Sequence, residues 1–245
     1  MSFRALRRAV ALAFALAGCV LDYWRFRFSG AMTLDRRALW LQRASRRVLT
    51  SFGIRPSVTG DIPTRGLIVS NHLSHLDILI LSSITPCFFV SKIEVGAWPY
   101  FGEAARNGGT IFLNRGNRAS ADAASAELAR RLTLPIPIVL FPEGTTSDGA
   151  QVLRFRSRLI EPAIAAAAPV TPAAIRYVAP VSERELCWYG DEPLLPHLWR
   201  VLRVSSFRAE VRFGPPQIYP DRRAAAAYTH DAVSAMRDAA QLPGC

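Results

Sequence analysis

The sequence is poor in cysteine, and its hydrophobic runs are short. The four cysteines lie far apart and form no metal-binding or redox spacing: Cys19, Cys87, Cys187 and Cys245. This spacing suggests neither a disulfide framework nor a zinc site, and it fits a reducing compartment best. The apolar run at residues 9–21 covers thirteen positions, whereas a helix needs about 20 apolar residues to cross a bilayer. We therefore do not expect this run to span a membrane comfortably.

Lysine is nearly absent, and the abundant positive charge is unevenly placed. The net charge is +11, and the first 55 residues hold eleven arginines against Asp22 and Asp35, which gives +9 for this part and +2 for the rest. Basic patches interleaved with aromatic residues are absent from the body of the chain, so nucleic-acid binding is not expected. Lys92 is the one lysine, and we single it out because a compact ammonium is not interchangeable with a guanidinium.

Residues 1–55 are predicted to form a basic amphipathic segment that associates with a membrane. Arginines flank its short apolar run on both sides, so the positive-inside rule gives the run no direction across a bilayer. Residues 34–52 place Trp40, Ala44 and Val48 at helical spacing and arginines at many other positions. This pattern is typical of a helix in the membrane interface, with arginines on anionic headgroups. The alternative is an ordinary amphipathic helix packed on the protein core.

Residues 56–245 are long enough for one well-buried domain, and half of the whole sequence is hydrophobic. Apolar strands alternate with helices, which predicts an α/β fold with a mixed, largely parallel sheet covered by helices on both faces. The predicted strands cover 66–70, 87–90, 109–115, 136–141, 170–177 and 207–213. The predicted helices cover 78–84, 121–131 and 194–204, with a basic amphipathic stretch at 153–164 and a closing helix after residue 221. No internal repeat and no long linker is evident.

Polar residues recur at the ends of three predicted strands. In chain order they are His72 with Asp77, then Arg115, then Glu143 with Gly144 and Thr145. In an open, largely parallel sheet the carboxyl ends of the strands line one crevice. We therefore expect these groups to lie together.

The turn after residue 70 carries the first of these groups. If a helix starts near His75, the turn folds Asp77 back towards the ring of His72, which gives a base with an orienting carboxylate. The alternative is that Ser74 and Asp77 form a capping box at the start of an apolar helix. His75 is not expected to take part, because its spacing to Asp77 places the two on opposite helix faces.

Residues 66–177 resemble the glycerophospholipid acyltransferases, the 1-acyl-glycerol-3-phosphate acyltransferase family. The first family motif, asparagine-histidine-x4-aspartate, matches Asn71, His72 and Asp77. The second, glycine-x-x-phenylalanine-x-x-arginine, matches Gly109, Phe112 and Arg115. The third, FPEGT, matches residues 141–145, and a proline-centred fourth motif is matched loosely by Val170, Pro172 and Ile175.

The resemblance implies transfer of a fatty acyl chain from an acyl-CoA or acyl carrier protein thioester to the free hydroxyl of a lysophospholipid, such as 1-acyl-sn-glycerol-3-phosphate giving phosphatidate. His72 would be the general base and Asp77 its orienter, without a covalent acyl-enzyme. The thioester is a co-substrate, and no cofactor or metal is implied. The acceptor headgroup would contact Arg115, Glu143, Gly144, Thr145 and Lys92.

One departure from the family pattern concerns the acceptor. Many phosphatidate-forming relatives have an arginine after the third motif, whereas Thr146 stands here. The run FPEGTTSDG looks more like relatives that acylate lyso-ornithine lipid or lysophosphatidylcholine, so the same chemistry on such a lysolipid is the alternative. We expect a peripheral or monotopic protein on anionic lipids at the cytoplasmic face of a bacterial inner membrane, where a cytosolic donor is available.

A second interpretation of the N-terminus stays open. Residues 16–19 read Leu-Ala-Gly-Cys after a basic start and an apolar stretch, which resembles a bacterial lipoprotein signal. The protein would then be an exported, non-catalytic lipid-binding lipoprotein, cleaved before Cys19. Export would remove an enzyme from a cytosolic acyl donor, so the two interpretations exclude each other.

Overall fold

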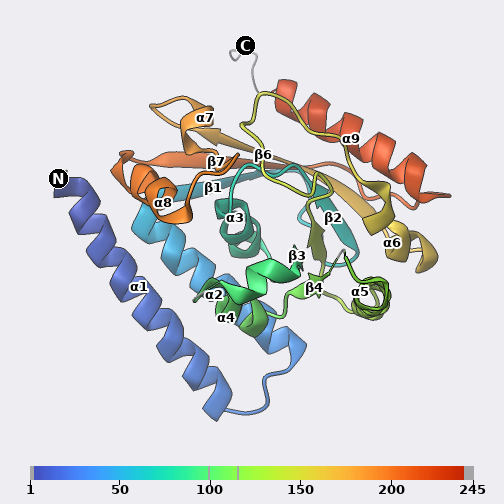
Figure 1. Ribbon diagram of the computed structural model, residues 1–245, viewed down its shortest axis with the longest axis horizontal. Helices are drawn as coiled ribbons and strands as arrows, with labels where there is room; N and C mark the ends of the chain where they lie inside the picture. The colour runs from blue at the N-terminus through green and yellow to red at the C-terminus, as the bar shows by residue number, and fades with distance from the viewer. Residues whose placement is uncertain (1–2, 99, 115, 240–245) are drawn as a thin grey trace.

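A computed structural model of the chain describes residues 3–98, 100–114 and 116–239 (Figure 1). Within these residues seven strands form one sheet in the order β1-β7-β6-β2-β5-β3-β4. The strands are β1 (Ile54–Thr59), β2 (Leu67–Ser70), β3 (Phe88–Lys92), β4 (Ile111–Leu113), β5 (Ile138–Leu140), β6 (Val170–Val178) and β7 (Phe207–Phe213). Neighbouring strands are parallel except β6 and β7, which are antiparallel. The predicted mixed, largely parallel sheet is therefore confirmed.

Helices cover both faces of this sheet, as expected from its apolar strands. The helices are α1 (Phe3–Phe28), α2 (Leu34–Phe52), α3 (Leu76–Ile84), α4 (Phe101–Asn107), α5 (Arg118–Arg131), α6 (Glu161–Ala165), α7 (Glu183–Leu186), α8 (Leu194–Arg203) and α9 (Arg222–Asp238), with short 3-10 turns η1 (Ile93–Ala97) and η2 (Ser157–Leu159). Ile68 of β2 lies in a core cluster with residues of α2, α3 and α8, whereas Leu67 and Val69 lie in a second cluster with residues of α5 and α9. Alternate side chains of one strand thus fill two cores, one on each face.

The sheet places several strand ends at one edge. Strands β2 to β6 all run in the same direction, and Val69 of β2 pairs with Leu140 of β5 on one side and Pro172 of β6 on the other. The chain therefore leaves β2, β5 and β6 at neighbouring points. The polar residues that follow β2 and β5 are brought to the same edge, as the sequence predicted.

Helix α2 packs into the protein core rather than facing outwards. Trp40, Leu49 and Phe52 are buried, and they share a core cluster with residues of α3 and β7. The expectation that the apolar side of residues 34–52 enters a membrane interface is therefore wrong, and the alternative of an amphipathic helix on the core is correct. Hydrophobic periodicity cannot distinguish the two, because a protein core and an acyl layer are both apolar. β1 begins at Ile54, so the boundary expected after residue 55 falls inside this strand.

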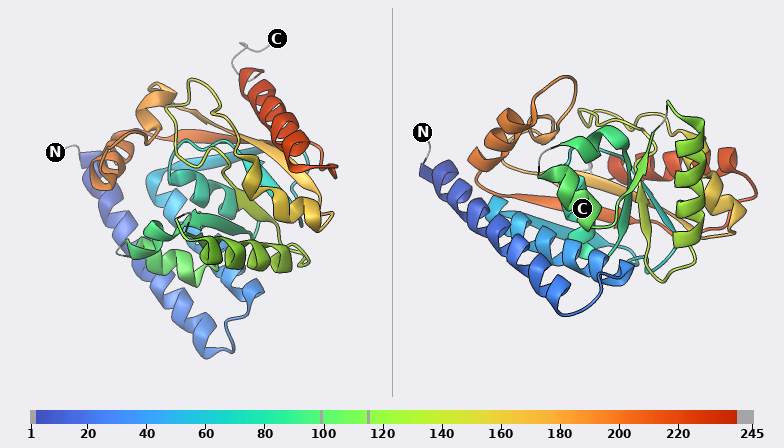
Figure 2. Two further views of the ribbon diagram at one scale, coloured as in Figure 1. Left: turned by 45° about the vertical axis from the view of Figure 1, so that its right-hand side comes forward. Right: turned by 60° about the horizontal axis from the view of Figure 1, so that its bottom comes forward.

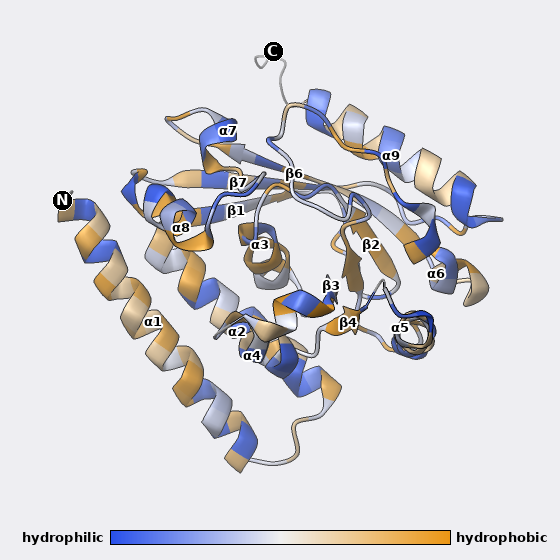
Figure 3. Cartoon of the chain, in the orientation of Figure 1, coloured by the Kyte–Doolittle hydropathy of each residue, from blue (hydrophilic) through white to orange (hydrophobic). Residues whose placement is uncertain are grey.

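Helix α1 lies beside α2 (Figures 2 and 3), and its apolar side is exposed. Nine large apolar side chains of α1 are exposed. Seven of them recur at spacings of three, four and seven, namely Phe3, Leu6, Val10, Phe14, Leu21, Trp24 and Phe28, and the other two are Leu16 and Val20. At 100° per residue these seven positions fall within an arc of about 80°. No helix among the described residues combines the length and hydropathy needed to cross a bilayer. We call these seven residues the α1 stripe.

The opposite side of α1 holds Cys19 against α2. Cys19 is 7% exposed, its thiol lies 3.8 Å from the carbonyl oxygen of Ala44, and its own carbonyl accepts a hydrogen bond from the Trp40 indole at 3.0 Å. Burial raises the pKa of the Cys19 thiol. In this structure Cys19 is thus a packing residue between two helices. Its lipidation stays a prediction.

Two parts of the chain differ from the sequence prediction. β1 was not predicted, because five of its six residues are exposed and it contains Pro56, so it shows neither an apolar run nor alternation. The stretch at 153–164, expected as one amphipathic element, has no regular secondary structure up to residue 156 and continues with the short helices η2 and α6. Pro162 in the first turn of α6 fits a helix start there and not a continuous helix through it.

The packing of α2 gives a stability prediction. Leu49→Ala should lower the free energy of unfolding by about 3 kcal/mol, because Leu49 is 2% exposed and the truncation leaves a cavity. Val10→Ala on the α1 stripe should change it by less than about 0.5 kcal/mol. Urea unfolding followed by circular dichroism measures both. Equal small effects would show that α2 is not part of the core.

Candidate active site

The turn between β2 and α3 folds a carboxylate onto a histidine. Asp77, in the first turn of α3, accepts a hydrogen bond from Nδ1 of His72 through Oδ2 at 2.8 Å. The same oxygen accepts the backbone N–H groups of Leu73 at 2.7 Å and Ser74 at 3.0 Å. The predicted contact between His72 and Asp77 is therefore present. One of the two hydrogen bonds of the alternative, a capping box, is present as well, because the backbone N–H of Ser74 donates to the side chain of Asp77 three residues later. Local helix capping therefore holds the carboxylate where it meets the ring.

The second oxygen of Asp77 is bound by a residue that the sequence did not single out. The hydroxyl of Tyr177, near the end of β6, donates to Oδ1 of Asp77, and it also lies 3.0 Å from the hydroxyl of Ser74. The Asp77 side chain is completely buried, so its charge depends on these four donors. Burial and the neighbouring Asp77 charge raise the pKa of Tyr177 well above its usual value, so this hydroxyl keeps its proton.

These contacts fix the tautomer of His72. The ionised carboxylate can only accept, so Nδ1 carries the proton and Nε2 presents its lone pair. Nε2 has no hydrogen-bond partner among the described residues, and 17% of the His72 side chain is exposed. The Phe141 ring stacks on the imidazole with centroids 3.9 Å apart and planes 10° apart. The ring is therefore held on one edge and one face, and its free nitrogen can accept a proton.

Asn71 joins the turn that carries His72 to β6. Its side chain donates to the carbonyl oxygen of Ile175 at 3.1 Å and accepts from the Ile175 N–H at 2.8 Å, and Asn71 is buried. The carbonyl of Ile175 also accepts from Arg237 of α9. The asparagine of the first motif therefore aligns the end of β2 with the strand that carries Tyr177.

Arg237 extends this network to the third motif. Its guanidinium, 4% exposed, donates to the carbonyl of Gly149 at 2.7 Å and pairs with Glu183 at 2.8 Å. Glu183 accepts the backbone N–H of Tyr177 at 2.7 Å. A buried arginine without a partner would be costly, so the ion pair and the carbonyl contacts hold the loop after β5 against β6.

Glu143 lies in that loop and is buried. The N–H of Leu153 donates to its Oε1 at 3.3 Å, whereas its Oε2 is enclosed and has no partner among the described residues. Burial, together with a smaller effect of the Asp77 charge, raises the pKa of Glu143 to about 8 against the opposing effect of the Leu153 N–H. Glu143 is therefore largely neutral near neutral pH, and its proton can be donated.

The remaining predicted site residues lie at the same sheet edge or outside the described part of the chain. Gly144 has a φ of 73° and its N–H donates to the Phe141 carbonyl, which closes the turn after β5. Thr145 and Lys92 are exposed, and no hydrogen bond or ion pair joins either to His72 in the part of the chain that is described. Arg115 lies outside the described residues. The structure thus brings together His72, Asp77 and the loop of Glu143, which is joined to the turn by the Ser147 N–H on the His72 carbonyl at 2.9 Å.

Tyr177 and Arg237 are the residues that sequence reasoning missed. Tyr177 ends the predicted strand 170–177, so a polar residue at the shared sheet edge was a usable signal. Arg237 had no such signal, because it is one of many arginines and lies 88 residues from Gly149. His75, which was not expected to take part, contacts Trp188 and His197 edge-to-face and not Asp77.

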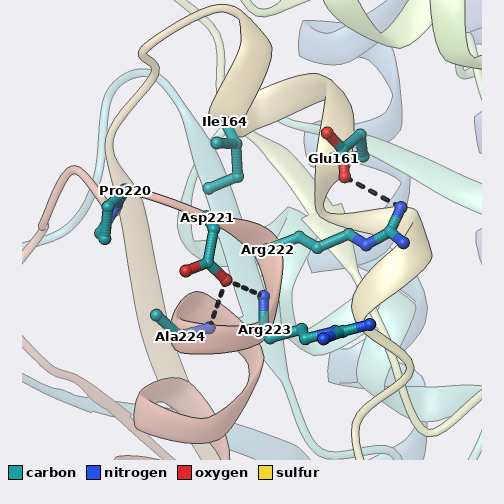
Figure 4. Close-up of a pocket in the computed structure, with 7 residues that line it drawn as sticks. All are labelled: Glu161, Ile164, Pro220, Asp221, Arg222, Arg223 and Ala224. Carbon is teal, nitrogen blue, oxygen red and sulfur yellow. Dashed lines mark hydrogen bonds and ion pairs between the residues drawn. The ribbon is translucent and has the colours of Figure 1, made fainter.

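Neither a metal-binding cluster nor a surface hollow adds a second candidate site among the described residues. Within the described ranges, no group of three or more histidine, cysteine, aspartate or glutamate side chains is arranged to hold a metal ion. A surface hollow of about 420 Å³ lies at the start of α9 (Figure 4). Its polar groups are already paired, because Asp221 accepts the N–H groups of Arg223 and Ala224 and Arg222 binds Glu161. The start of α9 also lies about 20 Å along the helix from Arg237.

The fold and the site describe an α/β protein with a histidine–carboxylate pair at the carboxyl edge of its sheet. Residues 55–176 match the family described as Acyltransferase. The chain is 36% identical over 220 residues to the lyso-ornithine lipid O-acyltransferase of Brucella abortus, covering 80% of this chain and 81% of that protein. It is 33% identical over 152 residues to the 1-acyl-sn-glycerol-3-phosphate acyltransferase of Neisseria gonorrhoeae, covering 62% and 60%.

The chain therefore belongs to the acyltransferase family, and it is an O-acyltransferase. The crystal structure of the 1-acyl-sn-glycerophosphate acyltransferase PlsC of Thermotoga maritima superposes with a TM-score of 0.71, covering 99% of this chain and all of that one. At 19% identity this likeness establishes the fold.

The buried Glu143 gives a pH prediction. Its pKa in the folded protein is about 8, above the usual 4.5, so between these values the folded state holds a proton that the unfolded state has lost. Stability contributed by this group therefore falls as the pH rises through this window. Glu143→Gln stays neutral, so its free energy of unfolding should match that of the parent near pH 4.5 and exceed it by pH 8. Urea unfolding at several pH values measures the difference, and a pH-independent difference would contradict the assignment.

Proposed function

We propose that the protein transfers a fatty acyl chain from a thioester donor to the free hydroxyl of a lysolipid, with His72 as the general base. The observation that carries the proposal is the hydrogen bond from Nδ1 of His72 to the buried Asp77 carboxylate, which leaves Nε2 free. A hydroxyl is a weak nucleophile near neutral pH, and base assistance is typically worth about 10²–10⁴-fold in rate.

The proposed reaction needs one proton transfer in each direction. Nε2 of His72 takes the proton of the acceptor hydroxyl as its oxygen attacks the thioester carbonyl, and Asp77 stabilises the imidazolium that forms. The tetrahedral intermediate then collapses, the carbon–sulfur bond breaks, and the imidazolium returns the proton to the leaving thiolate. The products are the ester and the free thiol. Because the acceptor itself is the nucleophile, the enzyme forms no acyl intermediate.

The acceptor that we propose is lyso-ornithine lipid. Two observations support it: Thr146 stands where an arginine follows the third motif in many phosphatidate-forming relatives, and the relative with 36% identity acts on lyso-ornithine lipid. The 33% identical relative favours 1-acyl-sn-glycerol-3-phosphate, so this lipid is the second candidate. Lysophosphatidylcholine completes the panel that distinguishes them.

The headgroup contacts belong to this proposal. Glu143, as a largely neutral acid, would donate a hydrogen bond to a headgroup oxygen if its enclosed Oε2 is uncovered by the bound acceptor. Gly144 and Thr145 would offer a backbone N–H and a hydroxyl, and Lys92 and Arg115 would offer positive charge.

The α1 stripe is the proposed membrane contact. Its seven apolar side chains lie on one side of a helix with Arg4, Arg7, Arg25 and Arg27 exposed near its two ends. A helix of this kind lies in the plane of the interface, with its apolar side in the acyl boundary and its arginines on anionic headgroups. We propose that the enzyme is a peripheral or monotopic protein on the cytoplasmic face of the inner membrane, where a cytosolic donor is available.

His72 is the residue whose removal tests the chemistry. His72→Ala should lower the rate of acyl transfer by at least about 100-fold with every lysolipid of the panel, because no other group takes the hydroxyl proton. The assay uses purified protein, a radiolabelled acyl thioester and lipid chromatography. Vesicle binding and the circular dichroism spectrum serve as controls and should be unchanged, whereas the unfolding midpoint should fall because the buried Asp77 loses one of its four donors. Substantial remaining activity in a folded variant would remove His72 from the mechanism.

The α1 stripe has its own test. Combining Val10→Gln, Phe14→Gln and Leu21→Gln should lower co-sedimentation with phosphatidylglycerol vesicles about tenfold or more, because three exposed apolar side chains lose their burial in the acyl boundary.

A matched variant changes three exposed apolar residues elsewhere, with Val58→Gln, Ile62→Gln and Ile218→Gln. This variant should bind vesicles like the parent. If both variants bind equally well, the α1 stripe is not the membrane contact.

A further inference from the structure

Three arginines form an exposed row directly after the loop of Glu143. They are Arg154, Arg156 and Arg158, and we call them the arginine row. Arg154 and Arg156 are exposed on either side of Phe155, which is 5% exposed. In an extended chain, side chains two positions apart project from the same side. The backbone of Arg156 is extended, and Phe155 is buried between two exposed arginines, so Arg154 and Arg156 lie on one surface, with Arg158 following on the short helix η2.

The arginine row carries uncompensated charge. Among the described residues, no hydrogen bond or ion pair is made by any of its three guanidinium groups, and residues 149–160 contain no acid. The nearest acids in the chain are engaged, since Asp148 lies 3.7 Å from Arg184 and Glu161 pairs with Arg222. Three adjacent positive charges without a carboxylate repel one another, so an anionic partner would stabilise them.

The backbone of the row is fixed to the active site. The N–H of Arg156 donates to the carbonyl of Pro142 at 2.9 Å, and the N–H of Leu153 donates to Glu143 at 3.3 Å. Phe155 anchors the segment below, where its ring meets His230 of α9 edge-to-face. The row is thus held beside the loop that also binds the His72 turn.

The row lies on the other side of the sheet from α1. Phe155 belongs to the core cluster of α5 and α9, whereas Cys19 of α1 belongs to the cluster of α2, α3 and α8. Figures 1 and 2 show α1 at one end of the molecule and the chain before α6 beside α9 at the other. A bilayer in contact with the α1 stripe therefore leaves the row to a partner that arrives from water.

We propose that the arginine row is the docking surface for an acidic carrier protein that delivers the acyl thioester, an inference that rests on the proposed function. Nucleotide sites are concave and mostly apolar, whereas these arginines stand exposed on the surface. An exposed row of positive charges suits a protein partner whose surface carries carboxylates. Such complementary charges speed the encounter of the two proteins and fix their relative orientation. The arginine row binds the carrier protein beside the active site, and His72 remains the general base of the proposed reaction.

The test compares three donors with the same acyl chain. They are the acyl carrier protein thioester, acyl-CoA and the neutral acyl-pantetheine, each assayed with the full-length protein at low salt. Combining Arg154→Gln, Arg156→Gln and Arg158→Gln should lower kcat/KM for the carrier protein about tenfold, through KM, and raising the salt should shrink this loss. The losses with acyl-CoA and acyl-pantetheine should stay below about twofold.

A matched triple variant removes the same charge elsewhere, with Arg55→Gln, Arg65→Gln and Arg203→Gln, all exposed residues. It should keep the kcat/KM of the parent with all three donors. An equal loss in both variants overturns the proposal, because net charge alone would explain it. A loss of kcat/KM confined to acyl-CoA means that the arginine row binds nucleotide phosphates. Equal losses with all three donors mean that the row affects the acceptor or the fold. Either outcome overturns the proposal.

Direct binding separates this proposal from the proposed function. If the parent transfers acyl chains from no donor, the proposed function fails, and calorimetry with the acylated carrier protein still decides the role of the row. An affinity that falls about tenfold in the row variant and not in the matched variant supports docking. An unchanged affinity in both overturns it.

Discussion

The hydrogen bond between Nδ1 of His72 and the carboxylate of Asp77 depends on much of the surrounding structure. A fully buried carboxylate is stable only if donors replace its water, and these donors come from two places. The turn supplies the N–H groups of Leu73 and Ser74, and β6 supplies the hydroxyl of Tyr177. The second source requires that β2 and β6 stay in register, which Asn71 secures through its paired hydrogen bonds to β6. The charge that orients the His72 ring thus depends on the sheet as well as on the motif.

The two sides of the molecule suit the two substrates of the proposed reaction. An acceptor with one acyl chain resides in a membrane, and the exposed apolar residues of α1 lie on the side of the sheet that packs with α2 and α3. A water-soluble donor approaches from elsewhere, and the unpaired arginines after Glu143 lie on the side that packs with α5 and α9. The sheet edge with His72 and Phe141 joins the two sides. An arrangement of this kind would let a lipid and a soluble thioester meet at one imidazole without either one having to cross the protein.

The sequence predicted the elements with strong local signals. The strand at 207–213 has the predicted bounds, and α9 begins after Asp221, whose carboxylate caps it through the N–H groups of Arg223 and Ala224. The prediction that α2 lies in a membrane interface was wrong. A helical pattern of apolar residues shows that one side of the helix is apolar, but it does not show whether protein or lipid covers that side. β1 was missed because an exposed edge strand has little need of apolar residues and is held by its neighbour β7. In each case the missing information lies in a distant segment.

By itself, the sequence determined the candidate site residues and their order, because a histidine, an acid five positions later and an acidic turn follow apolar strands whose ends must meet in a parallel sheet. It also determined the capping of α3, since Ser74 and Asp77 are three positions apart. Only the tertiary structure decided that Tyr177 completes the shell of Asp77, that Arg237 holds the Gly149 loop, and that α2 is core while α1 keeps an apolar side exposed. These contacts join residues roughly 90 to 100 positions apart or depend on which helix covers which face. The spacing of residues within a short stretch of sequence does not predict these contacts, because they depend on how the helices and loops pack once the sheet has formed.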